Sequence, residues 1–203
     1  MSSNRDRVFV IGASGDIGSR VVRGLIKKGI ETTAYVRNET KANDLFKDEL
    51  ATGQLSIVVG TYTSIDVYRK AIRGHTRLFL LVVGDTYKPA SMSQTKEIFG
   101  KIAFDQGVRQ IVDLSSFNVR TDGNQGIIGY MHKTSEDKLW ALVDDNPDMR
   151  SLVVLRPGAF MSNHFMGDAQ LVKQANKLVS CGPPTSITTW IDTRGKRLEP
   201  HLL

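Results

Sequence analysis

The stretch Val8–Gly18 reads VFVIGASGDIG, and its pattern decides the fold. Four apolar residues are followed by glycines at positions 12, 15 and 18, and then by apolar residues at helical spacing. This order predicts a buried strand that turns sharply into a helix. Gly12 would permit the tight turn, Gly15 would let a phosphate approach the backbone, and Gly18 would let the helix pack closely on the strand.

A helix that begins in such a turn presents unpaired N–H groups and a partial positive charge to an anion. The turn at 12–18 therefore predicts a binding site for the pyrophosphate of a dinucleotide. The alternative is a tight turn within a sheet that binds nothing.

The next strand-like segment indicates which dinucleotide is bound. It reads ETTAYV over Glu31–Val36 and is followed by Arg37, where an NAD-preferring protein usually has an acid that accepts from the ribose 2′-OH. A guanidinium at this point would pair with the 2′-phosphate of NADP(H), and Lys41 would add a second positive charge. Glu39 is interpreted as a local cap or ion-pair partner. The alternative for Arg37 is a solvated side chain at a strand edge.

Composition places the chain among single-domain proteins with a packed core. It has 203 residues, of which 40% are hydrophobic. Its one cysteine, Cys181, excludes an internal disulfide and suits a reducing compartment, and a nucleophilic role is not expected for it. No apolar run approaches the roughly 20 residues of a membrane span, and MSSNRDR at the N-terminus is unlike a secretory signal. We therefore expect a cytoplasmic protein with no membrane partner.

The formal net charge of +6 allows two classes of partner. The basic residues are scattered, with no dense run and no aromatic–basic stripe, so nucleic acid is only a minor alternative. A mildly basic field also suits a phosphate-rich dinucleotide, which is the partner we expect. No metal site is expected.

Strand-like and helix-like patterns alternate along the chain, which predicts an α/β fold with one doubly wound parallel sheet of the Rossmann type. Six strands are predicted at Arg7–Ile11, Thr32–Val36, Leu55–Val59, Arg77–Val83, Gln110–Leu114 and Ser151–Leu155, with a possible seventh at Ile187–Ile191. Helices are predicted at Ile17–Lys28, Lys41–Leu50, Ser64–Ile72, Met92–Gln106 and Thr134–Asp144. Ligands of such sheets bind beyond the carboxyl ends of the strands, where the strand order reverses.

Six motifs occur in an order and at a spacing that resemble one known family. They are GASGDIG, YVRN, LFLLVVG, IVDLSSF, HKTSEDKLW and VVLRPGAFMSN. Together they are similar to the NmrA-like branch of the atypical short-chain dehydrogenase/reductases over roughly residues 8–192. The resemblance implies an NADP(H)-binding fold whose members include quinone reductases, isoflavone reductases and redox sensors without turnover.

The resemblance also implies which residues hold the nucleotide. Gly12, Ser14, Gly15, Asp16 and Ile17 would line the pyrophosphate, next to Gly18, and Arg37 would hold the 2′-phosphate with Lys41 nearby. Three further groups would follow the fourth, fifth and sixth strands, on the adenine-side ribose and around the nicotinamide: Val82, Val83 and Gly84; Ser115, Ser116 and Phe117; Pro157, Gly158 and Phe160.

The expected catalytic pair departs from the usual Tyr-x-x-x-Lys pattern. Thr134 stands four residues after Tyr130, and Lys133 stands three after it, which is still a near neighbour on a helix. Tyr130, Lys133 and His132 are therefore the candidate acid–base groups, with His132 expected to titrate near neutral pH. The alternative for His132 is a histidine at the start of a helix that hydrogen-bonds locally.

The chain is expected to divide into a nucleotide-binding domain, residues 1–160, and a remnant of a substrate-side region, residues 161–203. The related proteins run on further, so the sequence resembles a shortened member whose substrate side is open or completed by a partner chain. The expected function is NADPH-dependent reduction of a quinone or small carbonyl. The alternatives are a non-catalytic NADP(H) sensor that acts through a protein partner and an inactive fragment.

Overall fold

The computed structural model describes residues 6–84, 86–120, 126–160, 173–174 and 190–191. The chain forms two compact units, Met1–Leu155 and Arg156–Leu203. In the second unit, β7 (Ala159–Phe160) pairs in parallel with β8 (Trp190–Ile191). The last two residues of the predicted seventh strand are therefore observed as a strand, and residues 187–189 lie outside the described part. Cys181 also lies outside it.

The first unit contains one sheet in which every strand is parallel to its neighbours. Its strands are β1 (Arg7–Ile11), β2 (Glu31–Val36), β3 (Leu55–Val59), β4 (Arg77–Leu80), β5 (Gln110–Leu114) and β6 (Ser151–Leu155). They are ordered β3-β2-β1-β4-β5-β6, so the strand order reverses between β1 and β4. This is the doubly wound order, and the predicted fold class is confirmed.

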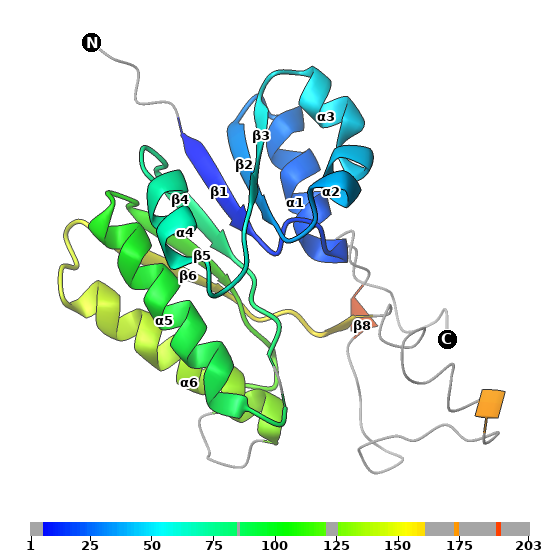
Figure 1. The fold of residues 1–203 in the computed structure, drawn as a ribbon. Helices are drawn as coiled ribbons and strands as arrows, with labels where there is room; N and C mark the ends of the chain where they lie inside the picture. The colour runs from blue at the N-terminus through cyan, green and yellow to red at the C-terminus, as the bar shows by residue number, and fades with distance from the viewer. Residues whose placement is uncertain (1–5, 85, 121–125, 161–172, 175–189, 192–203) are drawn as a thin grey trace. The chain divides into compact units, whose positions relative to one another are not determined.

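Helices cover both faces of this sheet (Figure 1). They are α1 (Asp16–Lys27), α2 (Glu39–Leu45), α3 (Lys47–Ala51), α4 (Ile65–Ala71), α5 (Pro89–Asp105) and α6 (Ile127–Asp144). One core cluster joins side chains of α4, α5 and α6 to the sheet, with Phe9, Tyr68 and Phe99 fully buried. The other joins α1 and α2 to the opposite face through Val22 and Phe46. Within the described residues, no helix has the length and apolar character needed to cross a bilayer.

Several predicted elements have different bounds in the structure, and three of these differences are informative. The helix predicted at 41–50 is two helices, broken at Phe46, whose φ of −114° leaves the helical range while its side chain packs into the core. The strand predicted to run to Val83 stops at Leu80, because its neighbour β1 ends at the paired residue Ile11. The helix predicted from Thr134 begins seven residues earlier, at Ile127, after an extended Gly126.

The turn between β1 and α1 is unusually close. Gly12 has a φ of +75°, in the left-handed region that favours glycine, and its carbonyl accepts a hydrogen bond of 3.1 Å from Gly15 N. Gly18 lies inside α1, where a Cβ would stand 2.1 Å from the carbonyl oxygen of Gly12. The backbone of α1 therefore approaches the end of β1 more closely than any side chain at position 18 would allow.

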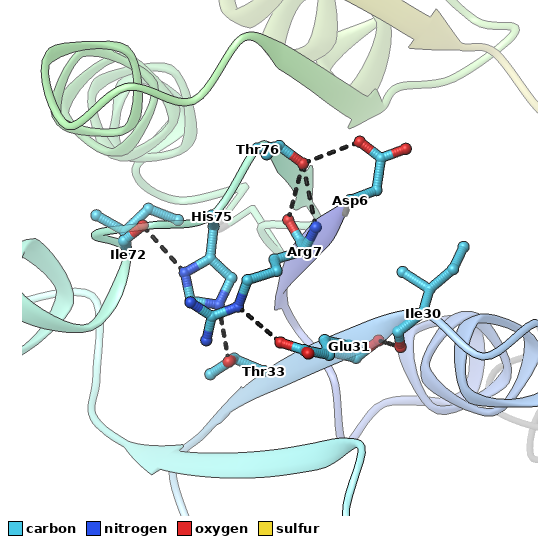
Figure 2. A network of polar contacts seen from close by, with 9 residues as sticks. Asp6, Arg7, Ile30, Glu31, Thr33, Ile72, His75 and Thr76 are labelled. Carbon is cyan, nitrogen blue, oxygen red and sulfur yellow. Dashed lines mark hydrogen bonds and ion pairs between the residues drawn. The ribbon is translucent and has the colours of Figure 1, made fainter. Parts of the chain in front are cut away.

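A buried histidine links α4 to the opposite, amino-terminal edge of the sheet. Figure 2 shows His75 between Thr33 and Ile72. Its Nδ1 donates to the carbonyl of Ile72 at 3.0 Å, so Nε2 of the neutral ring accepts from Thr33 Oγ1 at 2.8 Å. The ring packs edge-on against Phe9 at 5.1 Å. Burial lowers the pKa of His75 below its usual value, despite the opposing backbone hydrogen bond.

We expect the pKa of His75 to make the fold less stable in weak acid. The unfolded chain takes up a proton near pH 6.5, whereas the folded ring resists it, so stability is full above about pH 6.5 and falls by up to about 1.4 kcal/mol per pH unit below it. Urea unfolding between pH 7.5 and 5.5 measures this loss. His132 contributes in the same direction, so His75→Phe should flatten the profile only in part, and an unchanged slope would contradict the role of His75.

We expect two glycines of α1 to respond oppositely to alanine. Gly18→Ala should lower the free energy of unfolding by about 2–4 kcal/mol, because the new methyl group collides with the Gly12 carbonyl. Gly24→Ala is the matched control, since no atom lies within 4 Å of its added Cβ. It should raise stability by about 0.5–1 kcal/mol through helix propensity. Equal effects of the two substitutions in chemical unfolding would show that the close approach is not a constraint.

Candidate functional site

A cavity of about 440 Å³ lies beyond the carboxyl ends of the first four strands. Its wall is formed by the residues that end or follow β1, β2, β3 and β4: Ile11, Gly12, Ser14, Gly15, Tyr35, Val36, Arg37, Lys41, Gly60, Thr61, Tyr62, Leu81 and Val83. The β1/β4 boundary is where the strand order reverses, so the cavity occupies the place where sheets of this topology bind their ligands.

The glycine turn forms one side of this cavity. Gly15 is the N-cap of α1, and no side chain caps the helix there. The first N–H groups of α1 consequently have no side-chain acceptor at the N-cap and can bind an anion. A Cβ on Gly15 would lie 3.3 Å from the Gly12 carbonyl oxygen, so glycine also relieves a tight contact at this position.

Two cations line the cavity on the β2 side. Arg37 directly follows β2, and Lys41 lies in the first turn of α2, where its backbone N–H donates 2.9 Å to Asn38 Oδ1. Among the described residues that form the wall, none is acidic. Asp16, at the start of α1, instead pairs with Arg20 one helical turn away, at 3.1 Å. The arrangement provides positive charge without a competing carboxylate.

The far side of the cavity is formed by Tyr35, which belongs to the YVRN motif, and by residues that directly follow β3. Tyr35 OH donates to the carbonyl of Thr61 at 2.9 Å. Position 60 has room only for glycine, because a Cβ there would lie 2.1 Å from the Tyr35 hydroxyl oxygen. Tyr62 OH accepts from Val83 N at 3.4 Å. Gly60, Thr61 and Tyr62 were expected near a ligand from their position alone, because they directly follow a predicted strand.

Six of the nucleotide-binding residues expected from sequence line the cavity: Gly12, Ser14, Gly15, Arg37, Lys41 and Val83. Asp16, Ile17, Gly18, Val82 and Gly84 are neighbours in sequence that do not line it. Gly84 has a packing reason for being glycine, because a Cβ would stand 2.2 Å from Met131 Cε. Pro157, Gly158 and Phe160 belong to the second unit, so their proposed place at the nicotinamide stays a prediction.

The residues after β5 do not line the cavity either. Ser115 is buried and its Oγ donates to Glu136 Oε1 at 2.5 Å. Ser116 Oγ accepts from Asn118 N at 3.2 Å, and the ring of Phe117 is half-exposed. Glu136 is therefore buried within α6 and bound to Ser115 rather than exposed on the helix surface.

Tyr130, His132 and Lys133 all lie inside α6. Lys133 Nζ lies 2.6 Å from both carboxylate oxygens of Asp137, so its charge is directed along the helix surface rather than to Tyr130. Thr134, where an activating lysine usually stands, donates to the Tyr130 backbone carbonyl at 2.9 Å. The geometry shows no lysine engaged with the Tyr130 hydroxyl among the described residues.

His132 is half-buried rather than exposed at a helix start. Burial, followed by the nearby Lys96 ammonium, lowers the pKa of His132 to about 4, with Glu136 acting in the opposite direction. The ring is therefore neutral at pH 7, which corrects the expectation that it titrates near neutral pH. Its Nδ1 is buried without a hydrogen-bond partner among the described residues. At neutral pH the ring is suited to hydrogen bonding rather than to donating a proton as an imidazolium.

Several solved structures have the same fold and belong to longer chains than this one. The chain is similar to Pen from Bacillus thuringiensis, with a TM-score of 0.74, 15% identity, and coverage of 95% of this chain and 63% of that one. A nucleoside-diphosphate-sugar epimerase from Staphylococcus aureus matches with a TM-score of 0.72 and 16% identity, over 93% of this chain and 62% of that one. The triphenylmethane reductase of Citrobacter sp., solved with NADP(H), matches with a TM-score of 0.69 and 17% identity, over 93% of this chain and 61% of that one.

The chain thus spans less than two thirds of the length of these structures, and at such identities the likeness shows the fold alone. No curated protein is a significant sequence match. A sequence model of the family described as NAD(P)H-binding matches residues 12–180, which is most of the chain and includes the whole cavity wall except Ile11. This match confirms the family membership expected from the NmrA-like resemblance: the chain belongs to the NAD(P)H-binding family.

Proposed function

We propose that this protein binds NADP(H), with the adenosine and pyrophosphate part of the nucleotide in the cavity beyond β1–β4. One observation carries the proposal: the glycine turn, Arg37 and Lys41 converge on a single cavity whose described wall contains no acidic residue. A helix N-terminus and two cations complement the pyrophosphate and a 2′-phosphate, whereas NAD(H) lacks the second group. The triphenylmethane reductase with a similar fold was itself solved with NADP(H).

We further propose that the whole protein is a reductase for a quinone or small carbonyl. Bound NADPH would supply the hydride, and the chain would supply position and electrostatics. Lys133 is held by Asp137 and His132 is neutral at pH 7, so acid–base assistance from α6 is weak. A quinone needs less such assistance than an isolated carbonyl does, which favours the quinone as substrate.

The same observations support a second candidate, a non-catalytic NADP(H) sensor that acts through a protein partner. An engaged lysine and a neutral histidine leave binding intact and remove the usual proton donor. NADPH consumption with a panel of quinones and aldehydes separates the two candidates. Turnover supports the reductase, and tight binding without turnover supports the sensor.

We expect the protein to bind NADPH about 10- to 150-fold more tightly than NADH, because a charge-assisted contact to the 2′-phosphate is worth about 1.5–3 kcal/mol. Arg37→Asp should abolish or reverse this preference in isothermal titration calorimetry. Arg77→Gln is the control, since Arg77 begins β4 at the opposite edge of the sheet and pairs with Asp6. Equal wild-type affinities for the two nucleotides would refute the proposed role of Arg37.

If the protein reduces quinones, we expect Tyr130→Phe to retain the rate within about threefold. General acid–base help is usually worth about 10²–10⁴-fold, but Lys133 is committed to Asp137 and does not activate the phenol. Initial rates of NADPH oxidation at saturating nucleotide measure the effect, with NADPH affinity as the control. A hundredfold loss at unchanged affinity would mean that Tyr130 is the proton donor.

A further inference from the structure

Four polar side chains are buried together at the carboxyl end of β5. Lys96 of α5 and Asp113 of β5 are both 0% exposed, and Ser115 and Glu136 are 4% and 2% exposed. We call these four residues the β5-end cluster. None of them lines the cavity beyond β1–β4, and the glycine motif does not include them.

The first link of the cluster comes from α5. Lys96 Nζ lies 2.7 Å from Asp113 Oδ1 and also donates to the backbone carbonyl of Leu114 at 3.0 Å. One ammonium group therefore holds both a side chain and the last carbonyl of the strand. Burial raises the pKa of Asp113, and the Lys96 charge opposes that rise.

The second link comes from α6 and attaches to the next residue. Ser115 Oγ donates to Glu136 Oε1 at 2.5 Å, while Ser115 N donates to the carbonyl of Leu155 on β6 at 2.8 Å. Two helices thus fix two consecutive residues, Leu114 and Ser115, through buried polar contacts. Beyond them the chain leaves the sheet through Ser116 and the half-exposed Phe117.

Packing alone does not account for these residue types. A buried ion pair gains little net stability, because removing both charges from water costs about as much as their attraction returns, and apolar side chains of the same volume would often do as well. What the ion pair adds is a defined geometry, since Lys96 Nζ lies between Asp113 Oδ1, its ion-pair partner, and the Leu114 carbonyl, its hydrogen-bond acceptor, and β5 fixes the position of both. The cluster therefore specifies where β5 ends and in which direction the chain continues.

We propose that Lys96 and Glu136 are positioning residues, which hold the segment Ser115–Phe117 against the nicotinamide half of the bound nucleotide. The inference rests on the proposed binding of NADP(H). In a doubly wound sheet the strand ends beside the switch point face the ligand, and β5 is the next strand after β4, whose end forms the cavity wall. The adenosine half fills the cavity, so the nicotinamide half is the part that reaches the end of β5.

The experiment compares two ligands that differ in the nicotinamide half. NADPH contains both halves, and adenosine 2′,5′-bisphosphate contains only the adenosine half with its 2′-phosphate. Glu136→Leu removes the acceptor of Ser115, and Glu136→Gln keeps an oxygen in its place. By calorimetry, Glu136→Leu should lower the affinity for NADPH about tenfold and change the affinity for adenosine 2′,5′-bisphosphate by less than twofold. Glu136→Gln should keep the wild-type affinity for NADPH.

The α5 link is tested with the double variant Lys96→Met/Asp113→Leu, which removes both charges of the ion pair and leaves the hydrogen bond between Ser115 and Glu136 in place. The same selective loss of NADPH affinity is expected. Lys101→Met is the control, because Lys101 pairs with Asp105 on the exposed side of the same helix and should change neither affinity. If Glu136→Leu does not fold, Ser115→Ala, which deletes one hydroxyl group, replaces it.

The outcomes are distinct. Equal weakening of both ligands, or of neither, in folded variants would show that the cluster only supports the fold, and would overturn the positioning role. A wild-type protein that binds adenosine 2′,5′-bisphosphate while these variants show no selective loss would leave the proposed NADP(H) site standing. A wild type that binds neither ligand would overturn that site, and the positioning role with it.

Discussion

The close approach of α1 to the turn after β1 is the contact on which the rest of the structure depends. At Gly18 there is no room for a Cβ, which would stand 2.1 Å from the Gly12 carbonyl oxygen. The approach brings the N-terminus of α1 directly over the carboxyl end of the strand at which the sheet order reverses. It also ends β1 at Ile11, and because β4 pairs with β1 only as far as Leu80, the residues after β4 are released to form the cavity wall. A packing requirement of the helix thus places the N-terminus of α1 at the cavity and leaves the residues after β4 free to line it.

Local pattern predicted most of this fold, because buried parallel strands are short apolar runs whose ends are marked by polar residues or glycine. Four strands, at Arg7–Ile11, Leu55–Val59, Gln110–Leu114 and Ser151–Leu155, have the predicted bounds. The errors arose where a distant partner decides the outcome. The break at Phe46 follows from burial of its ring in the α1/α2 core, and the early end of β4 follows from the length of β1. Neither partner is visible within a local window of sequence.

The residues of the candidate site likewise fall into those that the sequence predicted and those that it did not. Arg37 and Lys41 were predictable because their place is fixed relative to the glycine turn, and Gly60 and Thr61 were predictable because they follow a predicted strand. The hydrogen bond between Tyr35 and Thr61 was not, because it joins the ends of two different strands. The β5-end cluster was missed because charged residues are usually exposed. A signal was nevertheless present, since Lys96 lies at helical spacing from Met92, Phe99 and Ala103, all of them buried on one face of α5. A lysine within an apolar helical stripe predicts a buried partner, here Asp113.

The two edges of the sheet treat their charges differently, and this difference supports the choice of site. At the amino-terminal edge, Arg7 pairs with Glu31 at 3.0 Å (Figure 2). Arg77 pairs there with Asp6 at 2.9 Å, so both guanidinium charges are neutralised within the protein. At the carboxyl edge, neither Arg37 nor Lys41 forms an ion pair with any residue of the described chain. Two cations that have no ion-pair partner among the described residues, placed beside a helix N-terminus, raise the local concentration of anions, and this supports the cavity as the place where a phosphate-rich ligand binds.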